Sequence, residues 1–235
     1  MTSVSSADLL QSSLGYRFHA LALLEEALTH SSLVNEQKTA TIQHNERLEF
    51  LGDAVLSLVM SEYLAAALPQ SSEGTLSKLK AQVVSEASLA QVARRLGLGE
   101  YLKLGRGEDR SKGREKDSLL ADALEAVLAA VHLDGGFEAS RTVTRSIFAE
   151  ELANIVTQQE QPGAGDYKTQ FQEWCQKRYD TLPRYDTVRE IGPDHQKIFE
   201  VELSVQGKVV GMGSGRSKKE AEQQAAKQAL RQAGT

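Results

Sequence analysis

Apolar residues recur every three or four positions from Ala7 to about Ile155, in a background rich in Leu, Ala and Glu. This spacing predicts an almost entirely helical segment, because it gathers apolar side chains along one side of each helix. Helix ends are indicated by Pro69 after the run 45–68, by Gly97 and Gly99 after 75–96, and by Gly135-Gly136 after 118–134. We therefore expect an all-α N-terminal domain over residues 1–155.

The pattern changes after a short polar segment. Residues 156–165 contain Gln, Pro and Gly without periodicity, which predicts a linker. Beyond the linker, two helical runs enclose three segments of alternating character: helices over 166–179 and 217–232, and strands over 184–191, 197–205 and 208–213. This order predicts a small α+β domain (α-β-β-β-α) over residues 166–235.

Composition narrows the class of protein. Residues AVILMFWYC make up 40% and charged residues 25%, as in ordinary globular domains. No run of about 18 apolar residues occurs, so we expect no membrane-spanning helix and no membrane partner. The N-terminus lacks the pattern of a secretory signal, and the single cysteine, Cys175, cannot form an intrachain disulfide. A reducing compartment, most simply the cytoplasm, is expected.

The charge is uneven along the chain. The formal net charge is −5, which by itself argues against a polyanionic partner. The last segment, 207–235, nevertheless has six Lys or Arg residues against two Asp or Glu. Affinity for nucleic acid depends on the charge at the contact face, so this segment could form one. An ordinary fluctuation of charge explains it equally well, and the two readings stay open at this point.

The stretch Asn45–Asp53 carries the most informative acids. With about 100° per residue, Glu46, Glu49 and Asp53 fall within an arc of roughly 60°, while the rest of the helix is mostly apolar. A helix of this kind is usually buried. Three like charges on one face repel and require compensation, commonly by a divalent cation. The alternative is a solvated face with lysines nearby, but no Lys occurs between Lys38 and Lys78.

A second helix offers two more acids. Asp122 and Glu125 are three residues apart and share a similar arc, opposite a side of Leu and Val. Two largely apolar helices that each present carboxylates suggest a site where carboxylate oxygens surround a metal ion. Oxygen ligands without Cys or His favour Mg²⁺ or Mn²⁺ over zinc.

These motifs resemble those of the ribonuclease III family. Asn45–Asp53 is similar to the family signature, and Asp117–Ala126 resembles its second acidic motif. Segments 28–32, 74–79 and 83–85 also resemble the helical domain of that family. The resemblance extends over about residues 7–235 and includes the second domain.

The resemblance implies roles for individual residues. Glu49, Asp122 and Glu125 would bind Mg²⁺, with Mn²⁺ as a substitute, and Asp53 and Glu125 would be most directly tied to catalysis. Two further acids, Glu46 and Glu73, would line the cleft. The family also implies a homodimer, in which Phe50 would pack into the partner subunit. The alternative for Phe50 is an ordinary core aromatic.

The second domain resembles a double-stranded RNA-binding domain, in the segments 166–174, 192–195 and 213–222. A-form RNA is read through its shallow minor groove and its phosphates. Gln170 and Glu173 would reach one minor groove, and His195 the next. Lys218 and Lys219 open the last helix, where free N–H groups and the helix dipole also attract phosphate.

The sequence thus predicts a metal-dependent endoribonuclease that hydrolyses double-stranded RNA. The resemblance implies 5′-phosphate and 3′-hydroxyl ends, short 3′ overhangs, and a role in processing ribosomal, messenger and transfer RNA. No P-loop pattern occurs, so no nucleotide cofactor is expected. The alternative is a non-catalytic, dimeric RNA-binding protein, which would be expected to have lost some of the acids.

Overall fold

The computed structural model describes residues 6–37, 43–160, 167–193 and 197–233. It divides into two compact units, one comprising Met1–Pro69 and Leu76–Ala153, the other Gln70–Thr75 and Asn154–Thr235. Each unit is described by itself.

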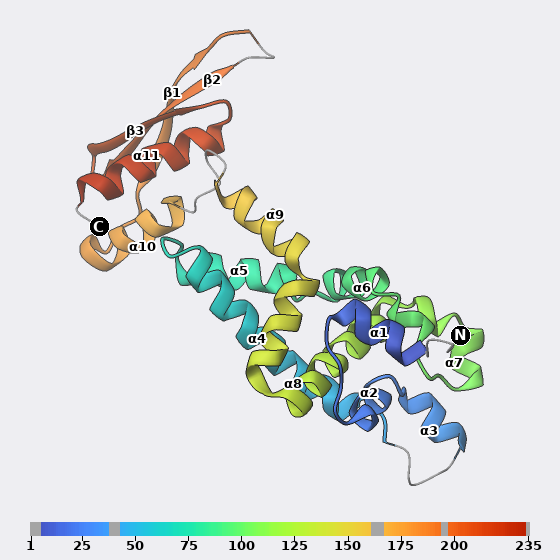
Figure 1. Cartoon of the computed structure of the whole chain (residues 1–235). Helices are drawn as coiled ribbons and strands as arrows, with labels where there is room; N and C mark the ends of the chain where they lie inside the picture. The colour runs from blue at the N-terminus through green and yellow to red at the C-terminus, as the bar shows by residue number, and fades with distance from the viewer. Residues whose placement is uncertain (1–5, 38–42, 161–166, 194–196, 234–235) are drawn as a thin grey trace. The chain divides into compact units, whose positions relative to one another are not determined.

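The described residues between 6 and 155 are mostly helical, as predicted (Figure 1). The helices are α1 (Ser6–Leu14), α2 (Leu21–Ala27), α3 (Ser31–Gln37), α4 (Glu46–Ala67), α5 (Glu73–Val83), α6 (Glu86–Arg95), α7 (Arg106–Arg110), α8 (Asp117–Ile147) and α9 (Ala149–Glu160), with 3-10 turns η1 (Leu98–Glu100) and η2 (Gly113–Glu115).

Three boundaries differ from the expected ones. The run 75–96 is two helices, because Ser85 is extended and its hydroxyl accepts the N–H of Ser88, which caps α6. The stop at Gly135-Gly136 is a kink within α8, where Gly136 has a φ of 77°. Helix α9 continues to Glu160, into the predicted linker 156–165, since Gln and Glu are good helix formers.

Helices α4 and α8 form the centre of the helical unit, where they pack side by side (Figure 1). Between Leu120 and Val131, α8 is buried except at its two acids. Helices α2 and α6 also pack on α8. A helix that is apolar nearly all round suits this enclosed position.

Helix α4 is, within the described residues, the one helix long and apolar enough to cross a membrane by length and composition. The expectation that no helix spans a membrane stays a prediction. The acids Glu49, Asp53 and Glu62 interrupt its apolar run without removing its average apolar character. A core helix passes the same test, and the buried side of α4 packs against α8.

The C-terminal unit has the predicted α-β-β-β-α order. Its elements are α10 (Tyr167–Tyr179), β1 (Arg184–Ile191), β2 (Ile198–Val205), β3 (Lys208–Gly215) and α11 (Lys218–Gln232). The strands form an antiparallel sheet in the order β1-β2-β3, with the helices on one face (Figure 1). A Cβ at Gly213 would overlap the backbone of Ala221, so this glycine allows α11 to lie close to β3.

Candidate active site and nucleic-acid interface

The acids of α4 and α8 are brought together by a close crossing of the two helices. A Cβ added at Gly52 would overlap the backbone carbonyl of Glu125. Only glycine permits this approach, and Gly52 directly precedes Asp53 in the chain. The crossing point therefore lies within the acidic motifs, and it places the acids of α4 beside those of α8.

The electrostatics show which acids interact. Burial raises the pKa of Glu125 to about 7, assisted by the charges of Asp53, Glu49 and Asp122. Burial also raises the pKa of Glu49, and the charges of Asp122 and Glu46 raise it further. The structure thus joins five of the six predicted acids into one cluster, called here the acid cluster: Glu46, Glu49, Asp53, Asp122 and Glu125.

In the described part of the chain, four of the five acids in the cluster lack an ion-paired partner, whereas the Glu46 carboxylate lies 3.8 Å from His44 Nδ1. Among the described residues, none makes an ion pair or side-chain hydrogen bond with Glu49, Asp53, Asp122 or Glu125. The alternative of a face balanced by neighbouring lysines therefore finds no support. Half-buried carboxylates that repel one another without a counter-charge are strongly disposed to bind a cation.

The donor set fits a hard divalent ion by its chemistry, because all the acids offer oxygen ligands. Their present side-chain positions do not converge, since no group of three His, Cys, Asp or Glu among the described residues is disposed to hold one ion. The fit therefore rests on donor type and on carboxylates that lack an ion pair to a described residue.

Glu73 belongs to a different unit from the other five predicted acids. It is the first residue of α5 and lies in the segment 70–75 that groups with the second unit. Its place in the cleft stays a prediction.

Two residues near the cluster were not predicted. Burial is the main cause that raises the pKa of Asp122, and the charge of Glu86, at the start of α6, raises it further. The charge of His30 lowers the pKa of Asp122. The His30 ring is fixed because its Nδ1 accepts the backbone N–H of Ser32 at 3.2 Å. His30 lies in a segment that resembles the family, but no spacing in the sequence connects either residue to Asp122.

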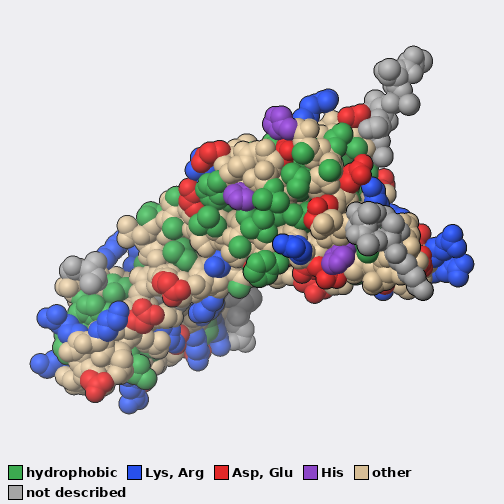
Figure 2. All heavy atoms as spheres, turned by 90° about the horizontal axis from the view of Figure 1, so that it is seen from below, with side chains coloured by type: hydrophobic (Ala, Val, Ile, Leu, Met, Phe, Trp, Pro, Cys, Tyr) green, Lys and Arg blue, Asp and Glu red, His purple; other side chains and the backbone are tan. Residues whose placement is uncertain are grey.

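Phe50 is on the solvent side of α4. Its side chain is 82% exposed and that of Leu58 is 55% exposed. The reading of Phe50 as a core aromatic of its own chain is therefore wrong, and α4, which was expected to be buried, has an exposed apolar side as well as a buried one. Hydrophobic side chains cover part of the surface in the space-filling view (Figure 2). Large apolar side chains as exposed as Phe50 and Leu58 are typical of interaction surfaces.

In the second unit, α10 packs against α11 through apolar side chains and is also held by an ion pair and a hydrogen bond. Lys168 Nζ lies 2.6 Å from the Glu222 carboxylate, and its backbone N–H donates to Gln223. Phe171 and Cys175 are buried against the sheet and α11. The remaining sides of α10 are therefore available for contacts outside the unit.

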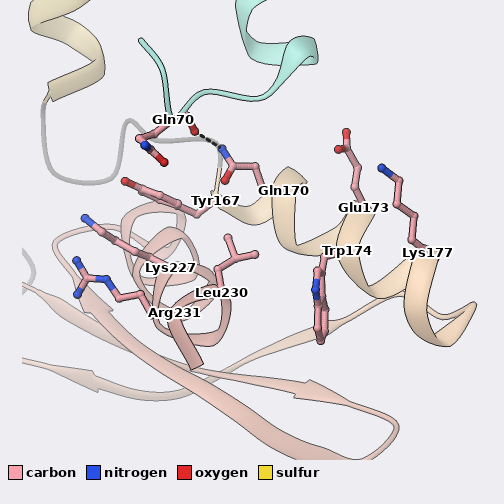
Figure 3. A pocket seen from close by; sticks show the side chains of 9 residues that line it. All are labelled: Gln70, Tyr167, Gln170, Glu173, Trp174, Lys177, Lys227, Leu230 and Arg231. Carbon is pink, nitrogen blue, oxygen red and sulfur yellow. Dashed lines mark hydrogen bonds between the residues drawn. The ribbon is translucent and has the colours of Figure 1, made fainter. Parts of the chain in front are cut away.

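Gln170 and Glu173 lie on such a side, in a pocket between α10 and α11 (Figure 3). The other residues of that pocket include Lys177, Lys227 and Arg231. Lys227 and Arg231 belong to the middle and last turn of α11, whereas Lys218 and Lys219 open that helix. The structure therefore places Gln170 and Glu173 near one end of α11 and the lysine pair at the other.

The start of α11 is well defined. Ser217 accepts the N–H of Glu220 at 3.2 Å, and the Glu220 carboxylate accepts the N–H of Arg216 at 2.7 Å. This capping arrangement fixes the first turn, which carries Lys218 and Lys219. Both lysines are exposed. His195 lies outside the described residues.

Two family models match the chain, one in each half. Residues 21–152 match the ribonuclease-III-like model, and residues 167–233 match the double-stranded RNA binding motif. Together with the acid cluster, these halves define an endoribonuclease that acts on double-stranded RNA. The alternative of a non-catalytic binding protein is not favoured, because all the acids of both motifs are present.

Relatives agree over nearly the whole length. The chain is 51% identical over 220 residues to ribonuclease 3 of Pseudothermotoga lettingae, covering 92% of this chain and 91% of the relative. It is 46% identical over 230 residues to ribonuclease 3 of Syntrophotalea carbinolica, covering 98% of each. The chain belongs to the ribonuclease III family.

A solved structure supports the fold of the helical unit. The nuclease domain of ribonuclease III from Campylobacter jejuni is 42% identical, with a TM-score of 0.58, and covers 62% of this chain and 98% of its own. That domain is described as having structural flexibility in a region involved in dimer formation.

Proposed function

We propose that this endoribonuclease hydrolyses the phosphodiester bonds of double-stranded RNA with Mg²⁺ held by the acid cluster, and leaves 5′-phosphate and 3′-hydroxyl ends. The observation that supports this most is that four carboxylates meet at the crossing of α4 and α8 without an ion pair to a described residue. Glu49, Asp122 and Glu125 would hold the ion, which when bound supplies positive charge and lowers the pKa of a water molecule.

The chain's own residues prepare that site. Because its pKa is about 7, Glu125 holds a proton on its carboxylate in a large fraction of metal-free molecules at neutral pH. It must release this proton to act as a ligand. Asp53 is exposed, next to the crossing, and its charge helps to raise the pKa of Glu125. This position suits the role in catalysis predicted for Asp53.

The test is incubation of the full chain with a long, end-labelled RNA duplex, with Mg²⁺, with Mn²⁺ and with a chelator. We expect cleavage with either ion and none with the chelator. The products should be ligatable at their 5′ ends without a kinase, because they carry phosphate there. Cleavage that persists in the chelator, or products with 3′-phosphate, would overturn the proposal. Natural targets would then be sought among precursors of ribosomal, messenger and transfer RNA.

We also propose that the chain acts as a homodimer through the apolar face of α4. Burying two side chains as exposed as Phe50 and Leu58 contributes about 1.5–3 kcal/mol each when complete. Sedimentation should give a dimer for the wild type and a folded monomer for Phe50→Glu. A wild-type monomer at micromolar concentration, or a Phe50→Glu dimer, would contradict this assembly. Leu133→Glu is the control, because Leu133 is an apolar residue of the same unit that is 53% exposed. It shows whether a new charge at any exposed apolar position also prevents dimer formation.

A further inference from the structure

One carboxylate of the second unit contacts cations from two separate elements. Glu190, on β1, lies with Oε1 3.2 Å from Nζ of Lys218 and with Oε2 3.6 Å from Nζ of Lys197. Lys218 opens α11, and Lys197 follows the predicted RNA-contacting residue His195 by two positions. Glu190 therefore contacts the ammonium group of the first residue of α11 and that of the residue directly before β2.

The contact with Lys218 is a specific one. Glu190 pairs in register with Phe199 on β2, and the Lys218 ammonium lies 5.6 Å from the centre of the Phe199 ring. The hydrogen bond from Lys218, then its charge and that of Lys197, lower the pKa of Glu190, so this side chain is ionised at neutral pH. By contrast, Lys219 makes no ion pair with a described residue. Of the two adjacent lysines, only Lys218 pairs with an anion within the part of the chain that the structure describes.

We propose that Glu190 limits the affinity for double-stranded RNA, because it binds the Lys218 ammonium in the free protein where a phosphate would otherwise bind. This inference rests on the proposed RNA-binding role of Lys218. A phosphate that contacts Lys218 must either displace the carboxylate or approach to within a few ångströms of a second anion. Both alternatives reduce the gain from the contact. Glu190 thereby acts as a residue that sets how tightly the enzyme holds its duplex.

The opposite reading is that Glu190 orients Lys218 productively. An exposed ion pair contributes little to holding a long side chain in place, since Lys218 and Glu190 are 60% and 40% exposed. The like-charge repulsion between carboxylate and phosphate acts in every bound geometry. Removal of the Glu190 charge should therefore strengthen binding, and the sign of the effect separates the two readings.

The experiment measures duplex binding by the full chain in a chelator over a range of salt concentrations, with a gel to verify that the duplex stays intact. Glu190→Gln should bind about three to ten times more tightly at low salt and show a steeper salt dependence. The matched control is Glu202→Gln, which removes one carboxylate from the same sheet without breaking an ion pair to a described residue. The control should change affinity by less than about twofold, because exposed charges at a distance are screened.

The Lys218→Ala background separates the two claims. Lys218→Ala alone should weaken binding, and adding Glu190→Gln to it should give a smaller gain than in the wild type. If Lys218→Ala binds as the wild type does, the proposed contact of Lys218 with RNA is wrong. If Lys218→Ala weakens binding but Glu190→Gln leaves it unchanged or weakens it, the inference about Glu190 is wrong. Melting curves verify that each variant is folded.

Discussion

The two halves of the chain present their charges in opposite states. Glu49, Asp53, Asp122 and Glu125 make no ion pair with a described residue, and the pKa values of Glu49, Asp122 and Glu125 are raised. In the second unit, Lys168 pairs with Glu222 and Lys218 pairs with Glu190. Carboxylates without an ion pair are stabilised most by a bound ion of high charge. Lysines in exposed ion pairs can replace a carboxylate partner by a phosphate at a small net cost in free energy. The difference agrees with the proposed roles of the two units, metal binding by the first and reversible RNA binding by the second.

The largest expected effect comes from the acid cluster. Glu125→Gln keeps the shape of the side chain and removes a charged ligand. The rate of duplex cleavage in Mg²⁺ should therefore fall at least about 100-fold, which corresponds to a loss of a few kcal/mol of transition-state stabilisation. Duplex binding measured in a chelator should stay within about twofold, because the binding surface lies in the other unit.

Glu138→Gln is the matched control, since it makes the same change on α8 at an exposed residue paired with Arg141, outside the cluster. It should cleave at the wild-type rate. Cleavage by Glu125→Gln at a rate close to that of the control would show that the cluster is not the active site.

The next effect concerns the helix crossing. Gly52→Ala places a methyl group on the backbone carbonyl of Glu125, so α4 and α8 must separate. Overpacking of this kind costs about 1–3 kcal/mol, which corresponds to a fall in melting temperature of about 3–10 °C. Cleavage should decline as well, because the two sets of acids move apart.

Gly74→Ala serves as its control. A Cβ there meets nothing closer than Ser72 Oγ at 4.0 Å, so α5 should be unchanged or slightly more stable. Equal melting temperatures for Gly52→Ala and the wild type would contradict the close approach of the helices.

A smaller effect appears in the stability of the metal-free protein. The folded-state pKa of Glu125 is raised from its usual value to about 7, so its charge opposes folding above pH 7, and this cost disappears below about pH 4.5. Glu125→Gln should therefore stabilise the folded protein at pH 8 in a chelator by about 1 kcal/mol, after allowance for solvent screening. This gain corresponds to a rise in melting temperature of about 2–4 °C. At pH 4.5 the two proteins should melt together. A gain that is the same at both pH values would exclude ionisation of Glu125 as its cause.

Much of the fold could be predicted because local pattern and tertiary structure agree. The strands of the second unit begin where alternation begins, within a residue, and the acids of α4 and α8 follow from helical spacing. Ser85 carried a local capping signal that explains the break between α5 and α6. The proximity of Asp122 to His30 and Glu86 depends on packing between distant elements, which periodicity does not encode.

Two further features needed the structure for the same reason. Gly52 looks like any glycine in a helix until the neighbouring backbone is placed against it. The pairing of Glu190 with Lys218 joins a strand to a helix 28 positions later, and nothing in the spacing of those residues indicates it. Placing the acids on their helices thus required the sequence alone, whereas recognising how they are held together required the fold.

The central claim is that the acid cluster binds the divalent ion that cleavage requires, and calorimetric titration of Mn²⁺ into the full chain tests it most directly. Titrations at pH 7 in buffers of different ionisation enthalpy count the protons released, and the raised pKa of Glu125 predicts that binding of the ion releases protons from that group. Glu125→Gln should bind at least about tenfold more weakly and release fewer protons, and Glu138→Gln should behave as the wild type does. Equal affinity and equal proton release in all three proteins would contradict the claim.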